Sequence, residues 1–595
     1  MCGISGIVEQ SGAAIDRTEL EKMTNLVAHR GPDAQGFFIE QNIGLGHRRL
    51  AIIDRSEKAN QPFCFQERYV MVFNGQLYNY LELRTELEQN GYCFSSSSDT
   101  EVLISAYDAW GIKCLDRFNG MWSFVIYDKQ EQQLFCARDR FGIKPFYYAE
   151  FNNKFCIASE IKQFTAIAGW QPKLNLKIAS EFLSTGFHDH TNKTFFEGVF
   201  QLLPGNYLTY CLKHKSLRFA SYYDLDKIVT QKSEELKQGD FFELLSNSVK
   251  LRMRADVPIG CTLSGGLDSS SIAVLMNRHQ NTDVPLSVFS AVFPGSGQDE
   301  SKYIKAIGEK IGASMFRVIP SVEDLAQEID QLIWHQDEPF ASTSVLAQTS
   351  VFRLAKKNGI TVLLEGQGAD EILAGYDKFY LPFIKKLWKT KPMVALNELR
   401  YWLSANGFKS FGAIGNFLKF KKRYARTSPN WLTIKMQKTL ENQNHQPSTH
   451  SIREMSLDAM FKQGLRIFLH YADRNAMRFS VESRVPFLDH QLVEYCLGLE
   501  DIEKIHKGKS KYILRKSLSE LLPYKVANRG DKNPYDIPDE NLFGHHQCFF
   551  SQQIKMAYKE YGTLFTKEVL AVSNPNTIWR IVLFYRWMKI FKVYC

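Results

Sequence analysis

A cysteine stands directly after the initiator Met, and its thiol could act as a nucleophile. A small residue at position 2 permits removal of Met1, and Cys2 would then carry a free α-amine beside its thiol. An α-amine titrates near ~8 and a thiol near ~8.5, so the amine can accept the thiol proton at neutral pH. A cysteine at this position is common by chance, and its interpretation depends on the residues that accompany it.

Three further positions supply what hydrolysis of an amide would need. Asn74-Gly75 offers a side-chain amide and a backbone N–H close together at a strand end, which suits an oxyanion hole. Arg49 can bind an α-carboxylate through two parallel hydrogen bonds, and Asp99 can form an ion pair with an α-ammonium. Singly, the two charges could be surface residues and Asn74-Gly75 a hairpin turn. Together with Cys2, they favour a site that cleaves the amide of a free amino acid.

A second chemical motif, LSGGLDSS, runs from residue 263 to 270, after an expected strand and at the start of an expected helix. Its glycines let the backbone approach a phosphate, and the turn N–H groups, the serine hydroxyls and the helix N-terminus supply donors. No Lys follows the glycines, so this is not a Walker A loop. The pattern is typical of enzymes that cleave ATP to AMP and pyrophosphate. We predict ATP binding by Ser264, Gly265, Gly266, Asp268 and Ser269.

Two carboxylates in this half are candidates for metal binding. Asp268 lies within the loop, and Asp370 lies in the stretch EGQGADE (365–371), which follows the expected strand Ile360 to Leu364. Ligands of open α/β sheets collect beyond the carboxyl ends of the strands, so both loops would meet at one site. Mg²⁺ usually takes one or two carboxylates together with phosphate oxygens. The sequence therefore predicts Mg²⁺ bound by Asp268 and Asp370 next to ATP.

The N-terminal motifs resemble those of the class II glutamine amidotransferase domain. They are MCGISGI (1–7), HRGPD (29–33), HRRLAIID (47–54), FNGQLYN (73–79), SDTE (98–101) and RDRFGIKPFYY (138–148). In that family the N-terminal cysteine attacks glutamine, and the fold is an αββα sandwich. The resemblance implies that Cys2 is the nucleophile and that Asn74 and Gly75 form the oxyanion hole. It also implies a set of glutamine-binding residues: Arg49, Ile52, Gln76 and Asp99.

The second half resembles the synthetase domain of asparagine synthetases. The resemblance lies in LSGGLDSS, EGQGADE, DRNAM (473–477), VESRVPFLD (481–489) and GKSKYILR (508–515). It implies that Lys511 stabilises negative charge that develops on the reacting groups. It also implies that ammonia passes between the two sites inside the protein, although the sequence itself shows no tunnel. The further ATP contacts that it implies are Leu263, Val292, Gly366 and Gln367.

Two positions depart from the pattern of the family. Gln76 stands where asparagine synthetases commonly have Glu, so we expect weaker glutamine affinity but an unchanged mechanism. Gln367 stands where the family often has the central Glu of SGEGSDE, and it cannot act as a base or a charged ligand. The GQGADE form also resembles bacterial members of the family, so we interpret it as a variant. It nevertheless puts in doubt any role that needs a carboxylate at 367.

The pattern of apolar runs and turns differs between the two halves of the chain. Residues 2–210 show short apolar runs separated by turns, which predicts a sheet-rich α+β domain, and the resemblance implies that this is the glutaminase sandwich. The polar stretch Asp226 to Gly239 is interpreted as a connector. Residues 235–595 are predicted to be an α/β parallel-sheet synthetase domain, with a largely helical part beyond about 375. Its expected strands are Val257 to Leu263, Leu286 to Phe293 and Ile360 to Leu364.

The composition is that of an ordinary globular protein, with 595 residues, 44% hydrophobic and 23% charged. The 11 cysteines occur singly, which fits reduced thiols and a cytoplasmic location. We find no signal peptide and no apolar run that would span a bilayer, and we interpret Thr577 to Val593 as a final helix packed on the body. Despite the formal charge of +9, the lysine clusters 385–391 and 419–426 are interpreted as solvated helix faces. We therefore expect no nucleic-acid or membrane partner.

The resulting hypothesis is glutamine-dependent synthesis of an amide, with glutamine, aspartate and ATP as the small-molecule substrates. One alternative keeps this chemistry but uses another acceptor, such as a sugar uronate or a peptide carboxyl. A second is a ring-closing synthetase of the β-lactam type, and the intact Cys2 argues against it because such relatives tend to lose the nucleophile. A third is a weakly active regulatory homologue. Homodimers are common in the family, and the expectation of one here is analogy alone.

Overall fold

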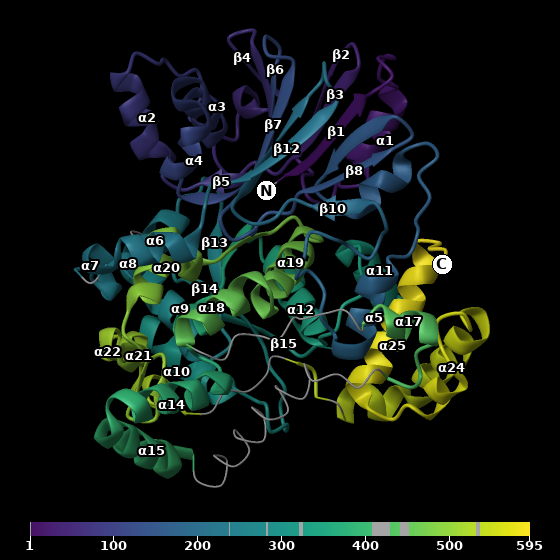
Figure 1. Cartoon of the computed structure of the whole chain (residues 1–595). Coiled ribbons are helices and arrows are strands. Elements are labelled where there is room, and N and C mark those ends of the chain that lie inside the picture. Colours follow the sequence, from purple (N-terminus) through teal and green to yellow (C-terminus); the bar gives the residue numbers. More distant parts are fainter. Residues whose placement is uncertain are drawn as a thin grey trace.

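The computed structural model describes residues 2–236, 238–280, 284–320, 325–406, 429–440, 451–530, 536–538 and 540–595. Figure 1 shows a sheet-rich upper half built from the N-terminal part of the chain and a lower half built from the rest. The N-terminus lies where the two halves meet, whereas the C-terminus lies at the side of the lower half. The N-terminal nucleophile candidate is therefore placed at the boundary of the two halves.

Two antiparallel six-stranded sheets form the middle layers of the upper half, with strand orders β10-β8-β9-β1-β3-β2 and β12-β11-β7-β6-β5-β4. The first sheet consists of β1 (Gly3–Glu9), β2 (Ala34–Glu40), β3 (Ile43–Arg49), β8 (Tyr147–Phe151), β9 (Lys154–Ala158) and β10 (Val199–Gln201). The second consists of β4 (Phe63–Phe65), β5 (Tyr69–Leu77), β6 (Gly120–Asp128), β7 (Gln133–Arg138), β11 (Asn206–Cys211) and β12 (Ser216–Ser221).

Alternation along the strands explains how these sheets are covered on both faces. On β1, Ile4 and Val8 enter the core between the sheets, where they share a cluster with Val72 of β5. Ile7 points the other way and packs with Leu20. The outer layers are α1 (Arg17–Asn25) and the short η3 (Ile161–Ala166) on one side, and α2 (Tyr80–Gln89) and α3 (Asp99–Trp110) on the other. The helix α5 (Leu176–Thr185) lies lower, against the C-terminal helix of the chain (Figure 1). The predicted αββα sandwich is confirmed.

A parallel sheet of order β15-β14-β13-β16-β17 organises the lower half. Its strands are β13 (Ile259–Thr262), β14 (Ser287–Ala291), β15 (Ser314–Val318), β16 (Val362–Leu364) and β17 (Glu482–Arg484). The three expected strands contain β13, β14 and β16, and the α/β prediction is confirmed. Neither β15 nor β17 was among the strands predicted from the sequence. The strand β17 carries no apolar pattern, because it is three residues long and has only polar side chains.

Helices cover both faces of this sheet and form the rest of the lower half. They are α8 (Phe241–Arg252), α9 (Leu267–His279), α10 (Ser301–Ile311), α11 (Leu325–Gln336), α12 (Ser344–Lys357), α18 (Ile452–Phe461), α19 (Gly464–Met477), α20 (His490–Gly498), α24 (His545–Glu560) and α25 (Pro575–Ile590). The predicted final helix corresponds to α25, whose Trp579, Leu583 and Trp587 are buried. Within the described residues, none of the helices is both long and apolar enough to cross a membrane.

The remaining elements are short or peripheral. They are α4 (Cys114–Arg117), α6 (Leu225–Gln231), α7 (Ser233–Leu236), α13 (Ala369–Ile372), α14 (Tyr380–Thr390), α15 (Pro392–Asn406), α17 (Ile434–Lys438), α21 (Asp501–Lys504), β18 (Ile505–His506), β19 (Lys509–Ser510), α22 (Tyr512–Ser517) and α23 (Tyr524–Ala527). One of the two lysine clusters, 419–426, lies outside the described residues.

A buried ion pair joins the two halves. Arg30, just after α1, donates from Nη1 to Asp473 Oδ2 at 2.8 Å and from Nη2 to Asp473 Oδ1 at 3.1 Å, and Asp473 lies on α19. The Arg30 side chain is fully buried, and a second carboxylate, Glu160, accepts from its Nη1 at 2.8 Å. Burial opposes ionisation, but the charges of Arg30, Lys144 and Arg474 hold the pKa of Asp473 well below its usual range. The pair is therefore ionised and screened from solvent.

We expect Asp473→Asn to reduce the free energy of unfolding by about 3–5 kcal/mol, because it leaves buried cations without their partner. Urea denaturation followed by circular dichroism measures the change. Glu88→Gln is the control, since Glu88 pairs with Arg84 on an exposed helix surface and its loss should cost less than about 0.5 kcal/mol. Equal effects of the two substitutions would contradict the structural role of the pair.

Candidate functional site

The predicted glutamine-binding residues surround one cleft in the upper half. Its lining is Cys2, Arg49, Leu50, Ile52, Ile53, Gln61, Phe73, Gly75, Gln76, Ser98, Asp99 and Thr100. Cys2 precedes β1, whereas Gly75 and Gln76 lie on β5 in the opposite sheet. The cleft is therefore formed where the ends of the two sheets approach each other. Its free volume is about 30 Å³.

Asn74 is oriented by the nucleophile candidate itself. The backbone N–H of Cys2 donates to Asn74 Oδ1 at 3.0 Å, which directs the amide nitrogen of Asn74 toward other acceptors. Gly75 follows, and a Cβ there would lie 2.2 Å from the carbonyl oxygen of Met121. Only glycine fits at this position against β6. One amide nitrogen and one backbone N–H are thus held next to Cys2, as an oxyanion hole requires.

The thiol of Cys2 lies beside a histidine that sequence reasoning had not singled out. Burial alone would raise the pKa of Cys2, but His47 nearby lowers it to about 7. His47 lies on β3, and its Nε2 is 3.1 Å from the carbonyl oxygen of Phe73. A carbonyl only accepts, so Nε2 carries a proton. The signal was present in the HRRLAIID motif, but only the pairing of β1 with β3 shows that His47 faces the nucleophile.

Asp99 and Gln76 form a pair within the cleft. Asp99 begins α3 and accepts from Gln76 Nε2 and from the backbone N–H of Leu77, both at 2.9 Å. Burial is the main reason that the pKa of Asp99 is raised to about 6. A glutamate at 76 would place a second carboxylate against it, whereas the neutral amide donates to it. The departure from the family pattern at 76 therefore has a local hydrogen-bonding partner.

Arg49 is held by the loop that follows β3. Its Nη1 donates to the carbonyl oxygen of Ser56 at 2.7 Å and to Asn60 Oδ1 at 2.8 Å, and its Nη2 donates to the carbonyl oxygen of Asp54. All of these acceptors are neutral, so the guanidinium charge remains available to an anionic substrate group. Its role in binding the α-carboxylate stays a prediction.

The phosphate-loop candidate lies between β13 and α9. Gly265 has φ 79° there, a left-handed conformation that favours glycine. The loop is closed by its own serines, since Ser264 Oγ and Ser269 Oγ are 3.1 Å apart and the N–H of Gly266 points to Ser264 Oγ at 3.3 Å. The buried Leu263 directly follows β13, and the buried Val292 directly follows β14, at the same edge of the sheet. The loop and these two side chains are thus brought together as expected.

Lys511 brings together the two predicted metal ligands. Its Nζ lies 2.5 Å from Asp268 Oδ2 and 2.8 Å from Asp370 Oδ1. Burial would lower the pKa of Lys511, but the two carboxylates raise it. Two converging carboxylates fit the donor set that Mg²⁺ uses together with phosphate oxygens. Gly366 packs against Asp268, where a Cβ would lie 3.0 Å from the Asp268 Cβ, so the EGQGADE segment contacts the phosphate loop directly.

A carboxylate near this site, Glu365, was not among the predicted residues. It follows β16, is buried, and accepts from Gln348 Nε2 at 3.2 Å and from the hydroxyl of Ser483. Burial raises its pKa. The partly exposed Gln367 is two residues further along. The segment thus retains a carboxylate, but at a different position from the one that the family pattern suggests.

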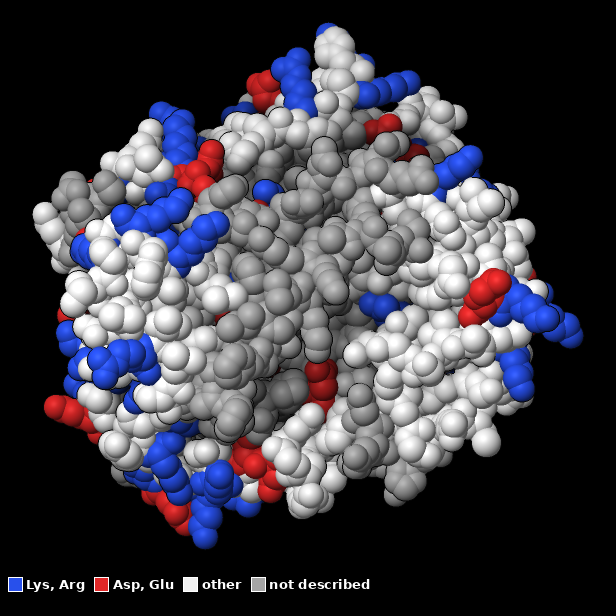
Figure 2. Space-filling model, turned by 60° about the horizontal axis from the view of Figure 1, so that its bottom comes forward, with Lys and Arg blue, Asp and Glu red and all other residues white. Residues whose placement is uncertain are grey.

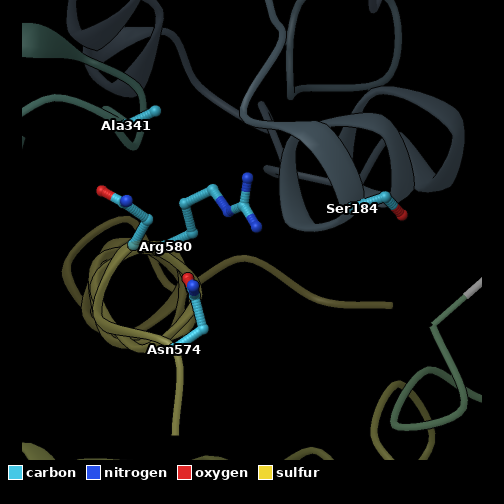
Figure 3. A pocket seen from close by; sticks show the side chains of 5 residues that line it. Ser184, Ala341, Asn574 and Arg580 are labelled. Atoms are coloured by element: carbon cyan, nitrogen blue, oxygen red, sulfur yellow. The ribbon is translucent and has the colours of Figure 1, made fainter. Parts of the chain in front are cut away.

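A larger cavity of about 330 Å³ lies elsewhere, between the end of α5 and the start of α25. Figure 3 shows the Arg580 side chain extending from α25 into the space between Ser184 and Ala341. None of the predicted catalytic or binding residues lines this cavity. Its size does not make it the chemical centre, because it lacks a nucleophile, a carboxylate or a phosphate loop.

Two family models match consecutive parts of the chain. A family model described as a glutamine amidotransferase domain matches residues 1–223, and one described as asparagine synthase matches residues 240–571. The glutamine-hydrolyzing asparagine synthetase 1 of Bacillus subtilis is 30% identical over 623 residues, covering 99% of this chain and 97% of that protein. The chain belongs to the asparagine synthase family. It is accordingly an ATP-dependent ligase of the glutamine-hydrolysing type, and the resemblance inferred from the motifs is confirmed.

Other relatives of this asparagine synthase family member include a protein named as an amidase and a further asparagine synthetase. Amidase chry2 of Gibberella zeae is 29% identical over 606 residues, covering 89% of this chain and 88% of that protein. Asparagine synthetase 3 of Bacillus subtilis is 28% identical, covering 90% of this chain and 87% of that protein. A solved glutamine phosphoribosylpyrophosphate amidotransferase of Bacillus subtilis shares 14% identity over 62% of this chain and 82% of its own, with a TM-score of only 0.29. Membership of the family therefore leaves the acceptor open.

We expect the affinity of this asparagine synthase family member for glutamine to fall as the pH drops through about 6, the pKa to which burial raises Asp99. Protonated Asp99 has no charge to attract the α-ammonium, so binding is full above this pKa and weakens up to tenfold per pH unit below it. Titration calorimetry on Cys2→Ala isolates this effect, because the variant lacks the thiol. The Asp99→Asn form of that variant should bind weakly at every pH; a pH dependence that survives in it would rule out Asp99 as the titrating group.

Proposed function

We propose that the chain is a glutamine-dependent asparagine synthetase that amidates the side-chain carboxylate of aspartate. The observation that carries the proposal is the presence of two complete constellations, one at Cys2 and one at Lys511, on a chain whose relatives include named asparagine synthetases. The regulatory alternative would not need either constellation. The retained Cys2, Asn74 and Lys511 therefore favour an active enzyme.

The first half-reaction takes place in the upper half. The Cys2 thiolate attacks the carboxamide carbon of glutamine, and the pKa of about 7 keeps a large fraction of the thiol ionised at neutral pH. The amide nitrogen of Asn74 and the N–H of Gly75 stabilise the oxyanion that forms. The α-amine of Cys2, which has accepted the thiol proton, passes it to the leaving nitrogen, so that ammonia departs and a thioester remains on Cys2. Water then attacks the thioester, which releases glutamate and restores the thiol.

The second half-reaction takes place beyond the carboxyl ends of β13 and β16. The acceptor carboxylate attacks the α-phosphate of ATP, pyrophosphate leaves, and an acyl-adenylate forms. The Lys511 ammonium is held next to Asp268 and Asp370, where it can neutralise charge on the phosphates. Mg²⁺, when bound by the two carboxylates, would supply further charge neutralisation for pyrophosphate. Ammonia attacks the acyl carbon, loses a proton and expels AMP.

A second candidate keeps this mechanism but changes the acceptor. It is favoured by the amidase-named relatives, which match 89% of the chain, and by the neutral Gln367 in the segment beside the phosphate loop. The experiment that separates the candidates follows asparagine, AMP and pyrophosphate by mass spectrometry, with ATP, Mg²⁺, glutamine and aspartate supplied. Asparagine formed in step with AMP supports the first candidate. Glutamate formed without AMP supports another acceptor.

We expect Cys2→Ala to abolish the use of glutamine and to leave synthesis from added ammonium salt within about twofold, because only the first site is changed. Lys511→Met should do the reverse, sparing glutamine hydrolysis and lowering the rate of pyrophosphate release by roughly 10²–10³-fold. Glutaminase and pyrophosphate assays on both variants measure the two effects side by side. Normal glutamine hydrolysis by Cys2→Ala would disprove the assignment of the nucleophile.

A further inference from the structure

The helical hairpin formed by α14 and α15, residues 380–406, exposes an unusual number of large apolar side chains. Figure 1 shows it at the lower left, at the end of the molecule farthest from the sandwich. The exposed fractions are 56% for Trp388, 73% for Met393, 43% for Leu396, 47% for Tyr401 and 43% for Leu403. Single exposed apolar residues are ordinary, but a group of them on one small element indicates a surface that contacts a partner molecule or a membrane.

Three of these side chains form a stripe along α15. Met393, Leu396 and Leu403 are separated by three and seven positions, which places them on one face of the helix. The opposite face is used internally, since Ala395 and Trp402 are both buried and Trp402 belongs to the small core beneath the hairpin. The stripe is therefore not the packing face of α15. It is a second apolar face that the described part of the protein leaves open to solvent.

Positive charges flank this stripe. Lys385, Lys389, Lys391 and Arg400 are exposed, whereas Lys386 donates to Asp501 at 2.7 Å. The single acid between residues 378 and 440 is Glu398, which is buried and accepts from the backbone N–H groups of residues 507 and 508. In Figure 2, Lys and Arg predominate on the left of the face shown, the side on which α14 and α15 lie in Figure 1. The hairpin thus combines open apolar side chains with a group of cations of which, among the described residues, only Lys386 forms an ion pair.

This combination determines the chemistry of the partner. The sequence that follows the hairpin is itself free of Asp and Glu as far as residue 440, so it brings no negative charge that would complement the surface. A nucleic acid would satisfy the cations but would not use a stripe of Met and Leu side chains. An anionic lipid surface satisfies both, because its headgroups attract Lys and Arg while apolar side chains enter the acyl boundary. We propose that the α14–α15 hairpin docks this protein on anionic membrane surfaces.

The docked orientation would bring the second reaction site close to the lipid. The buried Glu398 of α15 holds the turn between β18 and β19 through N–H···O bonds of 3.0 and 3.1 Å to residues 507 and 508. Lys511 follows that turn by three residues. The hairpin therefore supports, on its inner side, the segment that positions the lysine of the phosphate site. Docking is independent of the identity of the acceptor, and it can be tested without any substrate.

The test is co-sedimentation of the full-length protein with vesicles at 0.15 M salt. We expect it to pellet with vesicles of phosphatidylcholine and phosphatidylglycerol in a 3:1 ratio and to stay in solution with phosphatidylcholine alone. The triple variant Lys385→Gln, Lys389→Gln, Lys391→Gln should reduce the partition coefficient on the order of 100-fold. The triple variant Met393→Ser, Leu396→Ser, Leu403→Ser should reduce it at least tenfold.

Matched controls use residues of the same types elsewhere on the surface. Val284→Ser, Ile319→Ser, Ile434→Ser removes three side chains that are 69%, 63% and 71% exposed, and Lys213→Gln, Lys356→Gln, Lys357→Gln removes three exposed cations. Both controls should pellet like the unchanged protein, and all variants should keep its glutaminase rate and circular dichroism spectrum. The proposal is overturned if the protein ignores the anionic vesicles, if it pellets equally with neutral ones, or if the hairpin variants behave like their controls. Binding to duplex DNA without binding to vesicles would also overturn it.

Discussion

The buried pairing of Arg30 with Asp473 is the interaction on which the arrangement of both sites depends. From its Nε, Arg30 donates to the carbonyl oxygen of Cys2 at 3.0 Å, while its terminal nitrogens hold Asp473 on α19. Arg30 thus links the nucleophile candidate to Asp473, which lies 443 positions after Arg30 in the sequence. A buried charge is costly unless it is paired, so the complete network around Arg30 and Asp473 forms only when both halves of the chain have folded.

The same helix continues toward the second site. Asn475, two residues after Asp473, donates to Gln348 Oε1 at 2.8 Å, and Gln348 in turn donates to the buried Glu365. Glu365 adjoins Gly366, whose backbone contacts Asp268 of the phosphate loop. A continuous line of contacts thus runs from the carbonyl of Cys2 to the candidate ATP site. This line gives a structural reason why the two chemistries can share one chain, since each site is positioned against the same rigid helix.

Much of the fold and of the candidate site could be predicted, because the information was local. The turn-rich texture of the first half and the strand, loop and helix around LSGGLDSS follow from short-range patterns, and Cys2, Asp99 and Lys511 lie within motifs. What could not be predicted depends on register and on distant contacts. His47 faces Cys2 because it pairs with Ile4 across two strands, and Glu365 is a site candidate because of its burial. The lysines of the hairpin are exposed, as their charge pattern predicts, but charge alone does not show which apolar side chains lie open beside them.

The position of α19 also limits how chains of this architecture can diversify. A crossover in the connector before α8 would join an upper half and a lower half that had not evolved together, and any mismatch at residue 30 or 473 would leave ions buried without partners. Exchange of whole domains would therefore tend to destabilise the protein before it could give a new specificity. The exposed outer face of a peripheral element such as the α14–α15 hairpin can change without unpairing a buried ion. New targets can be acquired there by point substitution, while the paired interior that couples the two reactions is inherited intact.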